Sequence, residues 1–126
     1  MSLPSTRDLV QLARTAGYQV VAAQQLRANR WLLALNDDTG AAILTLIQAR
    51  PLISAADVQD LAELVRLRRP SRGILLAYGG AFSAAAQRTL AEMGDERLRL
   101  CTVLPPAAKQ DGDEMRAASP ALRPAP

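Results

Sequence analysis

A short polar motif closes the most apolar run of the chain. Residues 44–47 read LTLI, and Gln48, Ala49 and Arg50 follow at once. The Gln48 amide can offer a neutral oxygen ligand, and the Arg50 guanidinium can hold a phosphate through two parallel hydrogen bonds. Because arginine stays protonated at physiological pH, Arg50 cannot act as a general base. The motif therefore fits half of a catalytic site, the remnant of one, or the point where a buried strand meets water.

Two absences exclude more chemistry than any residue suggests. The 126 residues contain no histidine, which excludes Ser-His-Asp and Cys-His catalysis as well as histidine zinc sites. Cys101 is the single cysteine, so no disulfide can form within the chain and no cysteine cluster can hold a metal.

Arginines gather at the end of a predicted helix and in the loop after it. Four of them lie within seven residues: Arg66, Arg68, Arg69 and Arg72. Cations near a helix C-terminus complement its dipole, which is the simpler interpretation. The alternative is a phosphate-binding patch, joined in the fold by Arg50 or Arg88, whose binding would be sensitive to salt and indifferent to sequence. The net charge of +3, from 15 basic and 12 acidic residues, is compatible with both.

Local signals predict the elements that must position these residues. Ser5 with Asp8, and Ser54 with Asp57, have the spacing of capping boxes that begin helices. The sequence NDDTG at 36–40 is typical of a hairpin turn. We expect an α/β fold in the order αβββαβαβ, with a mixed sheet between helices. The predicted helices are 5–17, 54–69 and 82–93, and the predicted strands are 18–26, 30–35, 41–49, 72–78 and 97–104.

The length and the ends of the chain indicate one domain with a tail. Residues 1–104 carry the periodic pattern, whereas 105–126 are rich in proline and alanine and have none, which predicts a flexible tail. The first residues lack the pattern of a signal peptide, and no apolar run is long enough to span a membrane. We therefore expect a cytoplasmic protein without a membrane partner.

Three segments, in this order, resemble the restriction-endonuclease-like PD-(D/E)XK superfamily and its Mrr-like branch. LTLIQAR is similar to the strand that ends in Gln-x-Lys in that branch, and RGILLAYGGAFSAAAQRTLAE is similar to its strand-turn-helix unit. GYQVV after the first helix also fits. The resemblance covers about residues 7 to 101.

The resemblance implies a magnesium site that this chain matches only in part. The family builds the site from an acidic residue on the second strand and a Gln-x-Lys that ends the third. Gln48 matches this pattern, Arg50 replaces the lysine, and Trp31 falls where the acid belongs, although an indole has no oxygen to offer. Asp8 could supply an acid from the first helix, as in some relatives, but its capping position favours a local role. The prediction is a remnant site without a metal; magnesium is expected only if the site is active.

Three functions follow as hypotheses. The first is a catalytically degenerate nuclease-fold protein that binds DNA independently of sequence, or serves as a non-catalytic subunit of a DNA-processing or defence assembly. The second is an active endonuclease that uses Gln48, Arg50 and Asp8. The third is a protein-interaction module without a nucleic-acid role. Pairing with a second copy or with another protein stays open. The predicted DNA contacts are Arg50, Arg66, Arg68, Arg69, Arg72 and Arg88.

Overall fold

Local capping begins the helices where the sequence predicts. The computed structural model describes residues 3–108. The Ser5 side chain accepts the Asp8 N–H, and the Asp8 carboxylate accepts the Ser5 N–H, both at 3.0 Å. Three helices and seven strands result, and their order confirms the predicted α/β class with two short strands added. The elements are α1 (Thr6–Thr15), β1 (Gln19–Arg27), β2 (Arg30–Asn36), β3 (Ala42–Gln48), β4 (Leu52–Ile53), α2 (Ala55–Arg68), β5 (Arg72–Ala77), β6 (Ala81–Phe82), α3 (Ala84–Met93) and β7 (Leu98–Cys101).

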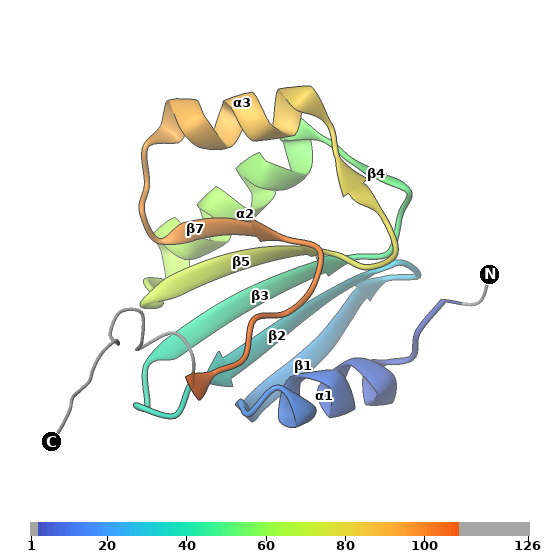
Figure 1. The fold of residues 1–126 in the computed structure, drawn as a ribbon, viewed down its shortest axis with the longest axis vertical. Helices are drawn as coiled ribbons and strands as arrows, with labels where there is room; N and C mark the ends of the chain where they lie inside the picture. The colour runs from blue at the N-terminus through green and yellow to red at the C-terminus, as the bar shows by residue number, and fades with distance from the viewer. Residues whose placement is uncertain (1–2, 109–126) are drawn as a thin grey trace, which may run out of the picture.

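The main sheet is mixed, as the order of elements predicts. Its strands lie in the order β1-β2-β3-β5-β7. The first three are antiparallel neighbours, whereas β5 runs parallel to both β3 and β7. Figure 1 shows α1 on one face of this sheet and α2 and α3 on the other. We call these the α1 face and the α2 face.

Alternation along β3 divides the core between the two faces. Ile43 and Ile47 belong to the apolar cluster under α1, whereas Leu44 and Leu46 belong to the cluster under α2 and α3. Successive side chains of a strand point to opposite faces. Gln48 therefore points to the α2 face, as Leu46 and Leu44 do.

The hairpin between β2 and β3 is fixed by one buried carboxylate. Asp37 accepts hydrogen bonds from the Thr39 N–H and hydroxyl, from the Ala41 N–H, and from Arg72 at 2.9 Å. Burial acts to raise the pKa of Asp37, but these hydrogen bonds and the Arg72 charge prevail and hold the pKa below 3.8. The turn and the start of β5 are thus tied together.

A second, two-stranded sheet joins the segments that leave β3 and β5. Leu52 and Ile53 of β4 pair in parallel with Ala81 and Phe82 of β6. Gly80 allows the close approach, because a Cβ there would lie 2.0 Å from the Arg50 backbone oxygen. The sequence did not predict this pair of strands, because each is only two residues long and follows a proline or a glycine turn that indicates a loop.

The chain beyond β7 returns to α1. The Tyr18 hydroxyl donates to the Pro105 carbonyl at 2.7 Å, the Ala107 N–H donates to the Ala16 carbonyl at 2.9 Å, and Ala107 is buried. The division into a domain and a tail stays a prediction, since 109–126 lie outside the described residues. Across 3–108, no helix is both long and apolar enough to cross a bilayer. The cytoplasmic location likewise stays a prediction.

Candidate functional site

An arginine binds the buried amide at the end of β3. Gln48 is 2% exposed, and its cross-strand neighbour on β2 is Arg30. Neighbours directly opposite each other in an antiparallel pair point to the same face. The Arg30 Nε donates to the Gln48 Oε1 at 2.6 Å. The oxygen that would serve as a metal ligand is thus an acceptor for a guanidinium.

The first two turns of α2 bring two carboxylates to the same arginine. Arg30 forms ion pairs with Asp57 at 2.7 Å and with Asp60 at 2.9 Å. Arg50 donates to the second oxygen of Asp57, which also accepts the N–H and hydroxyl of Ser54 at 2.9 and 3.1 Å. We call Arg30, Gln48, Arg50, Asp57 and Asp60 the Gln48 cluster. Its two positive and two negative charges sum to zero.

The Gln48 cluster does not suit a divalent metal. Magnesium needs several oxygen ligands in a near-octahedral array. The Gln48 oxygen and both Asp57 oxygens already accept hydrogen bonds from guanidinium groups, and two arginine charges would repel a dication. Within the described part of the chain, no three acidic or sulfur side chains come together as a metal site.

Trp31 does not occupy the place that the sequence suggested. It is fully buried under α1, where its Nε1 donates to the Thr6 hydroxyl at 3.2 Å. Its partner across the hairpin is Ile47, so its side chain points away from Gln48. The expectation that Trp31 lies beside Gln48, where the resemblance places the acid, is therefore wrong. Arg30, one residue earlier, lies beside Gln48 instead.

Asp8 is kept away from Gln48 by the sheet itself. It is exposed at the start of α1, on the α1 face, whereas Gln48 points to the α2 face. The backbone N–H and side chain of Ser5 lower the pKa of Asp8. These contacts confirm its capping role. They give no support to Asp8 as a ligand beside Gln48.

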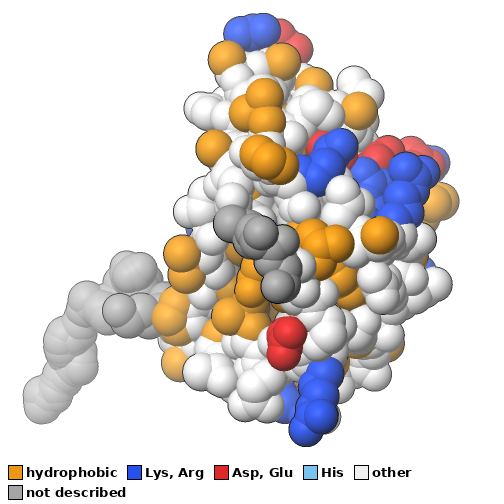
Figure 2. Space-filling model, turned by 90° about the vertical axis from the view of Figure 1, so that its right-hand side faces the viewer, with side chains coloured by type: hydrophobic (Ala, Val, Ile, Leu, Met, Phe, Trp, Pro, Cys, Tyr) orange, Lys and Arg blue, Asp and Glu red, His pale blue; other side chains and the backbone are white. Residues whose placement is uncertain are grey.

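The predicted arginine patch is divided between the two ends of the sheet. Gln48 pairs with Ala77 and Ile43 pairs with Arg72, so five residues of β3, roughly 17 Å, separate these ends. Arg50 lies at the Gln48 end. Figure 2 looks onto this end and shows basic side chains next to acidic ones, with apolar groups between them.

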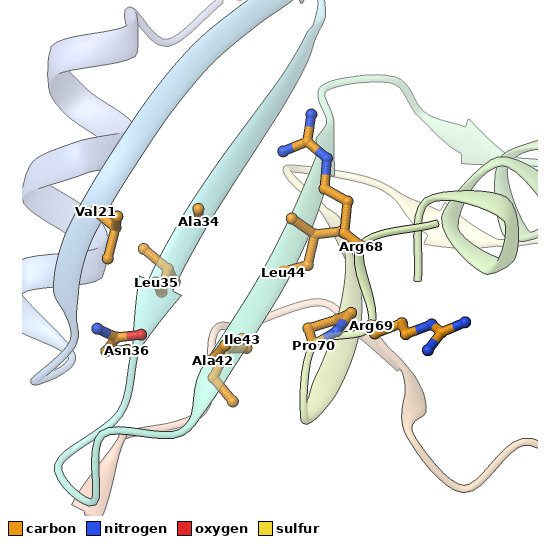
Figure 3. Close-up of a pocket in the computed structure, with 10 residues that line it drawn as sticks. All are labelled: Val21, Ala34, Leu35, Asn36, Ala42, Ile43, Leu44, Arg68, Arg69 and Pro70. Carbon is orange, nitrogen blue, oxygen red and sulfur yellow. The ribbon is translucent and has the colours of Figure 1, made fainter. Parts of the chain in front are cut away.

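Ion pairs further reduce the number of free cations. Arg66 pairs with Glu63, and Arg72 pairs with Asp37 at 2.9 Å. Among the charged groups that the structure describes, none forms an ion pair with Arg68, Arg69 or Arg88. Arg68 and Arg69 border a hollow at the opposite end of the sheet from Gln48 (Figure 3). Arg88 is exposed on α3.

Comparison with solved structures finds proteins of similar fold, whereas comparison of sequences finds none. No protein-family profile matches the chain, and no curated protein matches it. Its structure is similar to that of EndoMS in apo form, with a TM-score of 0.56 and 18% identity over 84% of this chain. A repair endonuclease from Pyrococcus abyssi is similar with a TM-score of 0.50 and 14% identity, again over 84%.

These similarities establish the fold alone. The chain spans 48% and 49% of the chains of these two neighbours, about half of each. The mixed sheet between helices is thus shared with these two structures, which agrees with the predicted fold class. Assignment to the Mrr-like branch stays a prediction.

Proposed function

We propose that this chain is a nuclease-fold protein that binds DNA without cutting it, alone or as the non-catalytic subunit of a larger DNA-processing or defence assembly. The observation that carries the proposal is the contact between Arg30 Nε and Gln48 Oε1 at 2.6 Å. The resemblance implies an acidic oxygen ligand beside Gln48, and in this chain an arginine lies there instead. One of the two structural neighbours is described as a repair endonuclease, which makes DNA the natural partner to test.

The chemistry of the Gln48 cluster supports the loss of cleavage. Phosphodiester hydrolysis by a metal nuclease needs a dication that polarises the phosphate and activates a water. Arg50 can neutralise phosphate charge but cannot accept a proton from water. In this chain, Arg30 and Arg50 compensate the charge of Asp57, and no carboxylate of the cluster is free of an arginine.

The remaining free arginines support DNA contact. The described residues hold twelve arginines and nine carboxylates, so they carry the whole charge of +3. Arg68 and Arg69 have no acidic neighbour within ion-pair distance in this part of the chain. Contacts of such groups with phosphates give affinity that falls steeply with salt and does not depend on sequence.

A salt series of DNA-binding isotherms tests this proposal. The double variant Arg68→Gln/Arg69→Gln is expected to bind duplex DNA more weakly and to lower the slope of log K against log salt by up to about 2. The double variant Arg7→Gln/Arg14→Gln is the matched control, because it removes two charges from exposed positions on α1. Its slope is expected to stay close to that of the parent. No detectable binding at about 50 mM salt would contradict the proposal and favour a pure interaction module.

Cleavage is tested separately on supercoiled plasmid. With Mg²⁺ or Mn²⁺ the plasmid is expected to stay intact, because the Gln48 cluster offers no free carboxylate. Nicking that disappears in Gln48→Leu would favour the active endonuclease instead. Nicking that disappears only in Asp8→Ala would give the acid on α1 the catalytic role.

A further inference from the structure

A hollow of about 210 Å³ opens on the α2 face, at the end of the sheet away from Gln48 (Figure 3). Apolar side chains of β1, β2 and β3 form its floor, and Pro70 of the turn after α2 forms part of the opposite side. Val21 in this floor is 61% exposed. The hollow is smaller than the roughly 300–1,000 Å³ of sites for drug-sized ligands. It therefore suits a group about as large as one nucleobase.

Three polar side chains border this apolar space. Asn36 lies on the β2 side, and Arg68 and Arg69 lie across the hollow at the C-terminal end of α2 (Figure 3). No other side chain in the described range 3–108 forms a hydrogen bond or an ion pair with any of the three. The site thus combines an apolar floor, an amide that can both donate and accept, and two unneutralised cations.

The backbone at Arg69 gives an independent reason to single out this site. Arg69 caps α2 in the left-handed region, with φ 53° and ψ 50°. Glycine is the usual residue at this position, because a side chain is strained there. Among residues 3–108, Arg69 is the one residue other than glycine with a positive φ. An arginine is held at a position where glycine would fit better; the residue lines the hollow, and its guanidinium extends outward from it (Figure 3).

We propose that this hollow binds a single nucleotide, with the base on the apolar floor and the phosphate at Arg68 and Arg69. A nucleobase has apolar faces and polar edges, so Asn36 can bond its edge while aliphatic groups cover its face. A base within a duplex cannot enter such a space, whereas a base of a single strand can. The proposal rests on the proposed DNA binding and narrows it to unpaired nucleotides, whether free or in a strand.

Fluorescence anisotropy with three probes tests the proposal. The probes are a labelled single strand of twelve deoxyadenylates, the same strand annealed to its complement, and dAMP as a competitor. The single strand is expected to bind roughly tenfold more tightly than the duplex, the size of one stacked base. Competition by dAMP at millimolar concentration would identify free nucleotide as a source. If dAMP does not compete, the ligand is a nucleotide within a strand.

Two variants assign the binding to this hollow. Arg69→Gly relieves the left-handed backbone, so it is expected to weaken single-strand binding about tenfold without lowering the melting temperature. Asn36→Ala, at a half-buried strand end, is expected to weaken the single strand more than the duplex. For Arg69→Gly, the single variant Arg14→Gln is the control, because it removes one charge from the other face.

The outcomes separate this inference from the proposed function. Equal affinity for single strand and duplex, weakened equally by Arg69→Gly, would leave DNA binding in place but refute the nucleotide hollow. Absence of binding to all three probes would refute both. A third outcome would also overturn the inference: an acidic apolar peptide such as a Glu-Leu repeat binds to saturation, while Arg69→Gly leaves the affinity for DNA unchanged. The hollow would then be a protein-docking site.

Discussion

Replacing Asp57 by asparagine tests whether the Gln48 cluster is a structural ion-pair network. The Asp57 side chain is 3% exposed and receives hydrogen bonds from Arg30, Arg50 and Ser54. Asp57→Asn keeps the size but leaves two guanidinium groups without their buried counter-charge. Removal of one partner from a buried pair costs about 3–5 kcal/mol. Because Arg30 and Arg50 are 16% and 39% exposed, solvent screens part of this loss, and we expect a cost just below this range, about 2–3 kcal/mol.

Urea denaturation followed by the fluorescence of Trp31, the single tryptophan, measures this cost. Asp60→Asn is the matched control, because Asp60 is 52% exposed and contacts Arg30 alone. It is expected to cost less than about 1 kcal/mol. In a domain of this size, the melting temperature should fall by roughly 10–20 °C for Asp57→Asn. Equal and small losses for the two variants would refute the reasoning, because the buried carboxylate would then be no more important than the exposed one.

Two further predictions concern the turns. The low pKa of Asp37 stabilises the folded protein. This stabilisation is fully present at a pH above 3.8, the ordinary pKa of aspartate, and is lost as the pH falls through the lower pKa of the folded state. The difference in stability between the parent and Asp37→Asn should therefore be constant near neutral pH and should disappear below about pH 4. Thermal melts at several pH values measure this difference. A difference that grows in acid would contradict the low pKa of Asp37. Gly80→Ala places a Cβ 2.0 Å from the Arg50 backbone oxygen, whereas at Gly40 no atom lies within 4 Å. Urea denaturation should show a larger loss for Gly80→Ala than for Gly40→Ala, which meets only the backbone strain of φ +86° at about 1–2 kcal/mol.

Much of the fold follows from signals that act over a few residues. The Ser5–Asp8 box begins α1, and Gly94 ends α3 in the left-handed conformation. A near-continuous apolar run indicated β3, which lies at the centre of the sheet, and the NDDTG turn indicated the hairpin. Because each signal is local, the sequence alone was enough to order the elements and to predict a mixed sheet.

The site was harder to predict because it depends on register. An error of one residue in the register of β2 assigned Trp31, in place of Arg30, to the position opposite Gln48, and Trp31 points to the other face of the sheet. Counting back from the turn, where Asn36 pairs with Ala42, would have placed Arg30 opposite Gln48. The contacts of Asp57 with two arginines, by contrast, needed the packing of α2, which no local pattern gives. The hollow beside Arg69 is likewise a product of tertiary packing.

Direct titration with Mn²⁺ tests the central claim, that arginines hold the oxygens a metal would need. The electron paramagnetic resonance signal of free Mn²⁺ should be the same with and without an excess of this protein, and Gln48→Leu should change nothing. Loss of the free signal at one ion per chain, restored by Gln48→Leu, would show that a dication displaces Arg30 from Gln48 and would contradict the account.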